Sequence, residues 1–164
     1  MRRESVFRVK DTAYVLGRRT WVMGIVNVTP DSFYDGGLYL DAGKAVAHGL
    51  ELAAEGADIL DIGGESSRPG SDPTPAEDEL HRVVPVIAGL RRQSGTLLSV
   101  DTMKPDIAEA ALDAGADIIN DVSSFRLDPR ILELAAGRKA GFIVMHMAGT
   151  PKTMQIQPRY DDVI

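Results

Sequence analysis

Gly56-Ala57-Asp58-Ile59-Leu60 and Gly115-Ala116-Asp117-Ile118-Ile119 are two versions of one pattern, and they start 59 residues apart. Each version begins with a glycine suited to ending a helix and runs into a short apolar stretch suited to a buried strand. One strand with its helix takes roughly 30 residues, so the interval corresponds to two such units. The repeat therefore predicts alternating strands and helices, an order that requires a parallel sheet with right-handed crossovers.

Short apolar runs mark five expected strands, and four helical patterns separate them. Each run is only a few residues long, as in strands that are buried on both faces. The stretch Thr74-Pro75-Ala76-Glu77 has the form of a capping box with proline at the first helical position, so it predicts a helix start. The expected strands are residues 21–26, 59–62, 97–100, 118–119 and 142–145, and the expected helices start near Asp41, Thr74, Pro105 and Asp128.

Residues 6–16 alternate loosely around a polar turn and predict a β-hairpin within residues 1–18. The 164 residues are enough for one core and too few for two domains, so residues 1–164 are interpreted as a single domain. An eight-unit barrel takes about 250 residues, whereas residues 19–164 supply five strands and four helices. Two α/β architectures stay open: a (β/α)8 TIM barrel cut short, and an open five-stranded sheet of flavodoxin type.

Composition excludes several classes of function. The chain has no cysteine, which excludes disulfides and thiolate metal sites and fits a reducing cytoplasm. A net charge of −6 and a pI near 5.0 argue against a nucleic-acid surface. The sequence shows no secretory leader and no membrane-spanning run of apolar residues. An anionic substrate would therefore need local cations or a metal ion.

The carboxyl ends of all five expected strands carry hydrogen-bonding side chains. Turn and capping chemistry explains one such end easily. Five in succession, at the edge where parallel α/β folds bind ligands, predict an active site. The segments are residues 27–37, 63–70, 101–102, 120–124 and 146–147.

The residue types at this edge suggest a flat heterocycle as one ligand. Asp101 and Asn120 offer paired acceptors and donors to a ring with amide-like edges. Val122 and Met145 could form apolar walls around such a ring. A base-like ring therefore fits this group of side chains.

A second group suits a phosphate. Asn27, Asp31 and Asp35 carry hard oxygen ligands suited to magnesium, and Arg68 offers a planar fork for phosphate oxygens. A metal ion and an arginine would let an acidic chain bind pyrophosphate.

Some residues fit two interpretations. Asp61 fits either a bond between strands inside a barrel or a ligand contact, and His146 fits either a base or a satisfied hydrogen bonder. Asp31 suits either a turn or a metal site. His48 and His81 fall on expected helices and are interpreted as surface or packing residues.

These segments resemble, in order, the signatures of dihydropteroate synthases, which are pterin-binding barrel enzymes. Asn27-Val28-Thr29-Pro30-Asp31-Ser32-Phe33 is similar to the amino-terminal signature, and residues 61–70 are similar to the second. The resemblance covers the amino-terminal portion of the family. It continues through Ser99-Val100-Asp101-Thr102, Ile119-Asn120-Asp121 and Met145-His146-Met147.

The resemblance implies a transferase of folate biosynthesis. Such an enzyme joins 4-aminobenzoate to the methylene carbon of 7,8-dihydropterin pyrophosphate and releases pyrophosphate with the help of Mg²⁺, and sulfonamides compete with the aminobenzoate. It further implies a cytoplasmic enzyme that is a homodimer when full length. The alternatives are a pterin-binding methyltransferase domain and a catalytically incomplete fragment of the synthase.

The resemblance also assigns roles to residues. Asn27 would contact magnesium or pyrophosphate, and Arg68 would neutralise the departing pyrophosphate. Arg68, Asp101 and Asn120 are the expected catalytic residues, and no Ser, Cys or His nucleophile is required. The expected substrate-binding residues are Phe33, Asp35, Ser67, Arg68, Pro69, Asp101, Asn120, Val122 and Met145.

The sequence departs from the family in two respects. Ser67 stands where the family usually has threonine, which keeps a hydroxyl and removes a methyl group. The family's later strands carry a further aspartate, a lysine that contacts both substrates and an arginine–histidine pair, and residues up to Ile164 offer no match to them. No lysine of this chain is assigned that role. The chain alone is therefore expected to self-associate and to show negligible turnover.

Overall fold

The computed structural model describes residues 3–29, 42–66, 73–146, 153 and 162. Within these ranges strands and helices alternate in the predicted order. Their bounds are β1 Ser5–Val9, β2 Thr12–Leu16, β3 Met23–Asn27, α1 Ala42–Ala54, β4 Ile59–Gly63, α2 Ala76–Arg91, β5 Leu97–Asp101, α3 Pro105–Ala114, β6 Ile118–Asp121, α4 Arg130–Gly137 and β7 Gly141–Val144.

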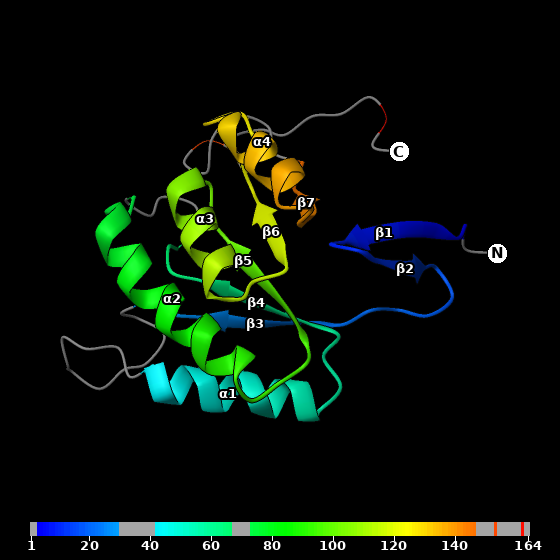
Figure 1. Cartoon of the computed structure of the whole chain (residues 1–164), viewed down its shortest axis with the longest axis horizontal. Helices are drawn as coiled ribbons and strands as arrows, with labels where there is room; N and C mark the ends of the chain where they lie inside the picture. The colour runs from blue at the N-terminus through cyan, green and yellow to red at the C-terminus, as the bar shows by residue number, and fades with distance from the viewer. Residues whose placement is uncertain (1–2, 30–41, 67–72, 147–152, 154–161, 163–164) are drawn as a thin grey trace.

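Strands β3 to β7 form one parallel sheet in the order β3-β4-β5-β6-β7. This sequential order is that of a barrel wall, and it excludes the flavodoxin-type order, in which the first strand lies between the second and third. The four helices cover one face of the sheet (Figure 1). The predicted hairpin is present as a separate antiparallel pair, β1 with β2.

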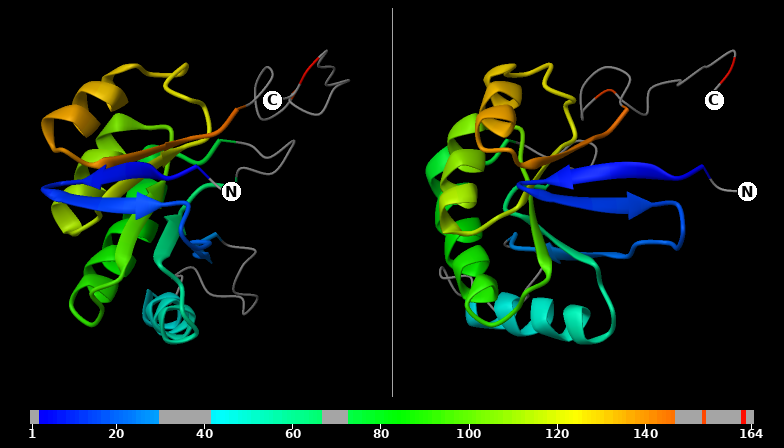
Figure 2. Two further views of the ribbon diagram at one scale, coloured as in Figure 1. Left: turned by 90° about the vertical axis from the view of Figure 1, so that its right-hand side faces the viewer. Right: turned by 45° about the vertical axis from the view of Figure 1, so that its right-hand side comes forward.

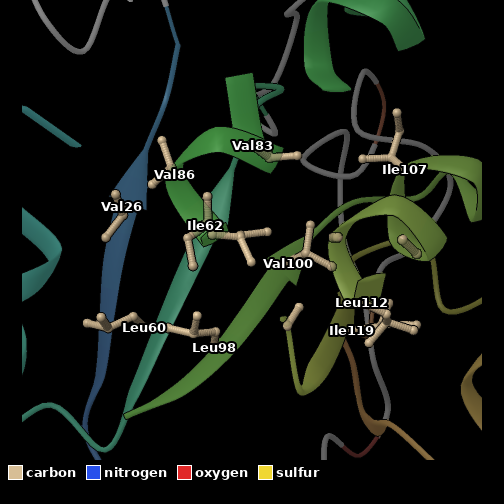
Figure 3. Packing of buried hydrophobic residues seen from close by; sticks show 14 of the residues in the cluster. Val26, Leu60, Ile62, Val83, Val86, Leu98, Val100, Ile107, Leu112 and Ile119 are labelled. Carbon is tan, nitrogen blue, oxygen red and sulfur yellow. The ribbon is translucent and has the colours of Figure 1, made fainter. Parts of the chain in front are cut away.

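The main core lies between the sheet and the helices. Leu60 and Ile62 of β4 lie between Val26 of β3 and Leu98 and Val100 of β5, and all five side chains are fully buried (Figure 3). Burying a side chain of this size contributes about 1.5–3 kcal/mol, so this layer fixes the sheet against the helices. On the helix side, α2 contributes Val83, Val86, Ile87 and Leu90.

The opposite face of the sheet changes from apolar to polar along the strands. Because every second residue of a strand points to the same face, the strand register sorts these side chains into rows. The row at the carboxyl ends is polar and is where a ligand site is expected. From the amino to the carboxyl ends the rows are Met23, Ile59 and Leu97; Ile25, Asp61 and Ser99; and Asn27, Gly63 and Asp101, next to Asn120 of β6.

The hairpin covers the apolar end of this inner face, across the sheet from the helices (Figure 2). Val9 packs there with Ile59 and Ile118. Gly141 at the start of β7 makes this approach possible, because a Cβ atom at that position would lie 2.8 Å from the ring of Phe7. The amino end of the inner face is therefore filled by side chains.

Asp58 and Asp117, the aspartates of the repeated pattern, make equivalent contacts. The carboxylate of Asp58 accepts a hydrogen bond from the backbone of Val22 at 2.9 Å, and that of Asp117 accepts one from Leu98 at 3.1 Å. Each aspartate thus ties the start of its own strand to the preceding strand of the sheet. Each also pairs with cations: Arg19 with Asp58, and both Lys10 and Arg91 with Asp117.

The capping box predicted at Thr74 is wrong. Helix α2 begins at Ala76 with Pro75 as its N-cap, and no side chain caps it. The reason is a competing partner, because the Thr74 N–H donates to the carboxylate of Glu65 at 3.0 Å. The predicted strand bounds also differ by one or two residues, which places Asn27, Asp101 and Asn120 inside β3, β5 and β6 rather than after them.

Candidate functional site

Asn27, Gly63 and Asp101 lie side by side at the carboxyl ends of β3, β4 and β5. A Cβ atom at Gly63 would lie 3.6 Å from Oδ2 of Asp101 and 3.9 Å from Oδ1 of Asn27. The glycine therefore leaves an open position between two side chains that carry acceptor oxygens. Such a gap can admit a polar edge of a ligand.

Asp61 lies one row deeper, and only 3% of its surface is exposed. Its Oδ2 accepts a 2.9 Å hydrogen bond from the amide nitrogen of Asn120, as in the first of the two interpretations of Asp61. Its Oδ1 and the hydroxyl of its neighbour Ser99 have no hydrogen-bond partner within the described ranges. A buried acceptor without a donor is costly, and a ligand with N–H groups could satisfy it.

The carboxyl groups at this edge have altered acidity. Burial raises the pKa of Asp101 to about 7, and the charges of Asp61, Glu79, Asp121 and Glu65 add to the effect. Burial likewise raises the pKa of Asp61. The amide of Asn120 and the hydroxyl of Ser99, which lies near the carboxylate without the geometry of a hydrogen bond, offset part of this rise. Near neutral pH, Asp101 therefore exists in both protonation states, so a ligand that donates hydrogen bonds can favour the ionised one.

The two residues predicted to form apolar walls directly follow β6 and β7. Val122 is buried and Met145 is half-buried. The carboxylate of Asp121 organises the turn between β6 and α4 by accepting hydrogen bonds from the backbone N–H groups of Ser123 and Phe125, at 2.8 and 2.6 Å. These bonds offset the strain of two consecutive non-glycine residues with positive φ, at positions 124 and 125.

A cluster of charges that the sequence did not reveal lies beside Asp101. The ammonium group of Lys104 donates to Glu65 at 2.7 Å, to Glu79 at 2.5 Å and to the carbonyl of Thr74 at 2.8 Å. Glu79 is fully buried and also accepts a 2.6 Å hydrogen bond from the hydroxyl of Thr102. Burial opposes the charged form of Lys104, but the two glutamates outweigh it and raise its pKa. All three N–H groups of Lys104 are thus engaged.

The described residues offer little to a metal ion on their own. Within those ranges, no group of three or more His, Asp or Glu side chains could hold one. Asn27 is exposed at the end of β3 and could supply one amide oxygen. Mg²⁺ commonly takes most of its ligands from phosphates and water. Asn27 could therefore serve as one ligand of a magnesium ion that a phosphate group also binds.

Several predicted residues lie outside the described ranges: Asp31, Phe33, Asp35, Ser67, Arg68 and Pro69. Their roles stay predictions. His48 and His81 are exposed on helices, as expected, and His146 is exposed just after β7. Among the described helices, none is long and apolar enough to cross a membrane.

Comparisons with known proteins agree with this geometry. The family model described as "Pterin binding enzyme" matches residues 23–164. The dihydropteroate synthase of Synechocystis is 44% identical over 156 residues, which are 95% of this chain and 54% of that protein. The chain thus spans about half the length of the curated relatives it matches.

Solved structures give the same result. The structure of Xanthomonas albilineans dihydropteroate synthase with 4-aminobenzoic acid superposes with a TM-score of 0.79 at 50% identity, covering 94% of this chain and 54% of the other. The Burkholderia cenocepacia dihydropteroate synthase complexed with 7,8-dihydropteroate gives 0.79 at 40% identity, covering 96% and 52%. The five-stranded sheet and its helices therefore match part of the barrel of these enzymes.

Proposed function

The chain belongs to the pterin-binding enzyme family, and from this premise we propose that it forms the pterin-binding half of a dihydropteroate synthase. In the proposed reaction the amine nitrogen of 4-aminobenzoate bonds to the methylene carbon of 7,8-dihydropterin pyrophosphate. The bond from that carbon to the pyrophosphate oxygen breaks, and the amine loses a proton. The observation that carries the proposal is the group formed by Asp61, Asp101 and Asn120 at the polar end of the inner face.

Asp101 and Asn120 would hold the edge of the pterin ring. A pterin presents an amino group and a ring N–H next to a carbonyl oxygen, and these match two carboxylates and an amide. Asp61 supports this role because it fixes the amide of Asn120 with its nitrogen toward Oδ2. It also keeps a second buried acceptor available. Val122 and Met145 would pack beside the ring.

The phosphate end of the substrate would lie toward Asn27. We propose that Asn27 contacts a magnesium ion bound to the pyrophosphate, where the metal would neutralise the negative charge of the leaving group. Arg68 would add a second cation, and Phe33, Asp35, Ser67 and Pro69 would contact the aminobenzoate. No protein nucleophile takes part, so the residues act by positioning and charge stabilisation.

The cellular location and the oligomeric state are proposed on family resemblance alone. We place the enzyme in the cytoplasm, where folate precursors are made, and we expect the complete protein to be a homodimer. The 164-residue chain by itself should bind pterin and show negligible turnover.

A binding titration tests the proposal on the chain itself. The chain should bind 6-hydroxymethyl-7,8-dihydropterin, and both Asp101→Ala and Asn120→Ala should weaken binding by at least about tenfold, since each removes hydrogen bonds to a buried polar edge. His81→Ala, on the exposed side of α2, is the matched control. Wild-type affinity in both site variants would refute the proposed site.

A second assay separates the synthase from a pterin-binding methyltransferase. The chain is fused to the remaining half of the Synechocystis relative, and pyrophosphate release is measured with and without 4-aminobenzoate and Mg²⁺. A synthase releases pyrophosphate only when both are present. Pterin binding without any such release would favour the methyltransferase alternative.

A further inference from the structure

The Lys104 cluster joins three separate parts of the site. Glu65 follows β4, and Thr102 and Lys104 follow β5. Thr74 precedes α2, and Glu79 lies in the first turn of that helix. The ammonium group of Lys104 bonds to Glu65, Thr74 and Glu79, and the Thr102 hydroxyl bonds to Glu79. Through these bonds the ends of β4 and β5 and the start of α2 are held at fixed distances.

Glu65 and Thr74 flank residues 66–73, and they are also bonded directly to each other. The N–H of Thr74 donates to Oε1 of Glu65 at 3.0 Å, while Lys104 bonds to Oε2 of Glu65 and to the carbonyl of Thr74. One cation therefore binds both Glu65 and Thr74, which are nine residues apart in the sequence.

We infer that Lys104 is a positioning residue, whose ammonium group holds Glu65, after β4, and Thr74, before α2, together and seats both against the strand that carries Asp101. The inference deepens the proposed function and rests on it, because Ser67, Arg68 and Pro69, which lie between Glu65 and Thr74 in the sequence, are the proposed contacts to pyrophosphate and aminobenzoate. Lys104 itself touches neither substrate, since its three N–H groups are already used.

A simple contribution to stability explains this cluster poorly. Two carboxylates and one ammonium group are withdrawn from water, and Glu79 has no exposed surface at all. Replacing a buried ion cluster by apolar residues is often neutral or stabilising, because desolvation offsets the attraction. What the cluster supplies is geometry: Lys104 has three acceptors for three donors, so its head group has one orientation.

Two variants test the inference. Lys104→Met alone leaves the carboxylate of Glu79 buried without its cation, and this variant is expected to unfold at a lower temperature. The double variant Glu79→Gln/Lys104→Met removes that buried charge and should recover most of the melting temperature. Lys139→Met is the matched control, because among the described residues Lys139 forms an ion pair with exposed Asp11 alone, far from the site.

Amide hydrogen exchange gives a readout that does not depend on ligands. In the double variant the Thr74 N–H should exchange at least about tenfold faster than in the wild type, while amides of β5 and β6 keep their rates. In Lys139→Met the Thr74 rate should not change. Wild-type exchange at Thr74 in the double variant would overturn the inference.

Binding gives the functional readout. The double variant should bind a pterin without phosphates within about twofold of the wild type, and should bind the pterin pyrophosphate about tenfold more weakly. An equal loss for both ligands would show a general structural role and overturn the inference. If the wild-type chain binds neither ligand, the proposed function fails, and the exchange result still decides the role of Lys104.

Discussion

The amide nitrogen of Asn120 lies 2.9 Å from Oδ2 of Asp61 on the inner face of the sheet. Asp61 belongs to β4 and Asn120 to β6, so the bond crosses the intervening strand β5. This bond fixes the orientation of the amide, since an Asn side chain can present either its oxygen or its nitrogen. It leaves Oδ1 of Asp61 buried and without a donor in the described part of the chain. Burying the Asp61–Asn120 pair therefore lowers the stability of the fold, but it leaves an acceptor oxygen available to a ligand.

Asp61→Asn should separate these two effects. Burial raises the pKa of Asp61, so its charged form is disfavoured in the folded chain, and a neutral amide removes that cost. Urea unfolding at about pH 8 should show a free energy of unfolding equal to or above the wild type. Pterin affinity should fall by at least about tenfold. Asp113→Asn, the same change at an exposed aspartate of α3, is the control and should leave the affinity unchanged. Wild-type affinity in Asp61→Asn would contradict the prediction.

Pterin binding should release protons near neutral pH. Free Asp101 has a pKa of about 7, so much of it is protonated at about pH 6.5. N–H donors of the ring stabilise the carboxylate and lower its pKa in the complex. Affinity should therefore rise as the pH increases toward 7 and level off above it. Calorimetry in two buffers of different ionisation enthalpy measures the released proton, and Asp101→Asn should abolish it. Proton uptake on binding by the wild type would refute this assignment.

Gly63→Ala should block the site without disturbing the fold. The added methyl group would meet Asp101 and Asn27 at ordinary contact distances of 3.5 to 3.9 Å, so the strand can accept it. It would nevertheless fill the open position between those two side chains. We expect the melting temperature to change little and the affinity for pterin pyrophosphate to fall by about tenfold. Gly95→Ala, which adds a methyl group in open space, is the control. A large loss of stability in Gly63→Ala would show that the position has a packing role instead.

The two repeated aspartates should differ in their contribution to stability. Asp117→Ala removes the partner of Lys10, of Arg91 and of the Leu98 N–H, and should cost about 2–4 kcal/mol. Asp58→Ala should cost less, because its partner Arg19 is largely exposed.

Unfolding can be followed by the fluorescence of Trp21, the one tryptophan of the chain, whose ring packs edge-on against Tyr14. Asp11→Ala, which breaks only an exposed pair with Lys139, should leave the unfolding midpoint unchanged. Equal costs for Asp58→Ala and Asp117→Ala would contradict the proposed difference between the two sites.

The fold was predictable because burial leaves a direct trace in the sequence. Strands such as β4 are buried on both faces and appear as short, mostly apolar runs. Glycines such as Gly56 and Gly115 adopt the positive φ that favours glycine after a helix. The strand order could not be chosen from such local signals, because it depends on which strands pair.

The site was predictable only in part. Asp101 and Asn120 were recognised as strand-end residues, and the register confirms that they are neighbours. The Lys104 cluster was not predicted, since its charged residues Glu65, Glu79 and Lys104 come from different parts of the chain. Each of them resembles an ordinary surface charge in its own segment. The error at Thr74 has the same origin, because Glu65 reaches it only after β4 and α2 have packed together.

The β1–β2 hairpin can pack in its final place only late in translation. Lys10 leaves the ribosome early, yet its partner Asp117 is 107 residues further along the chain. At roughly 5–20 residues per second, the two meet only after about 5–20 s of translation. Until β6 and β7 emerge, the apolar side chains of Met23, Ile59 and Leu97 lack the hairpin that later covers them. A nascent chain that stalls in this interval would be a natural substrate for chaperones.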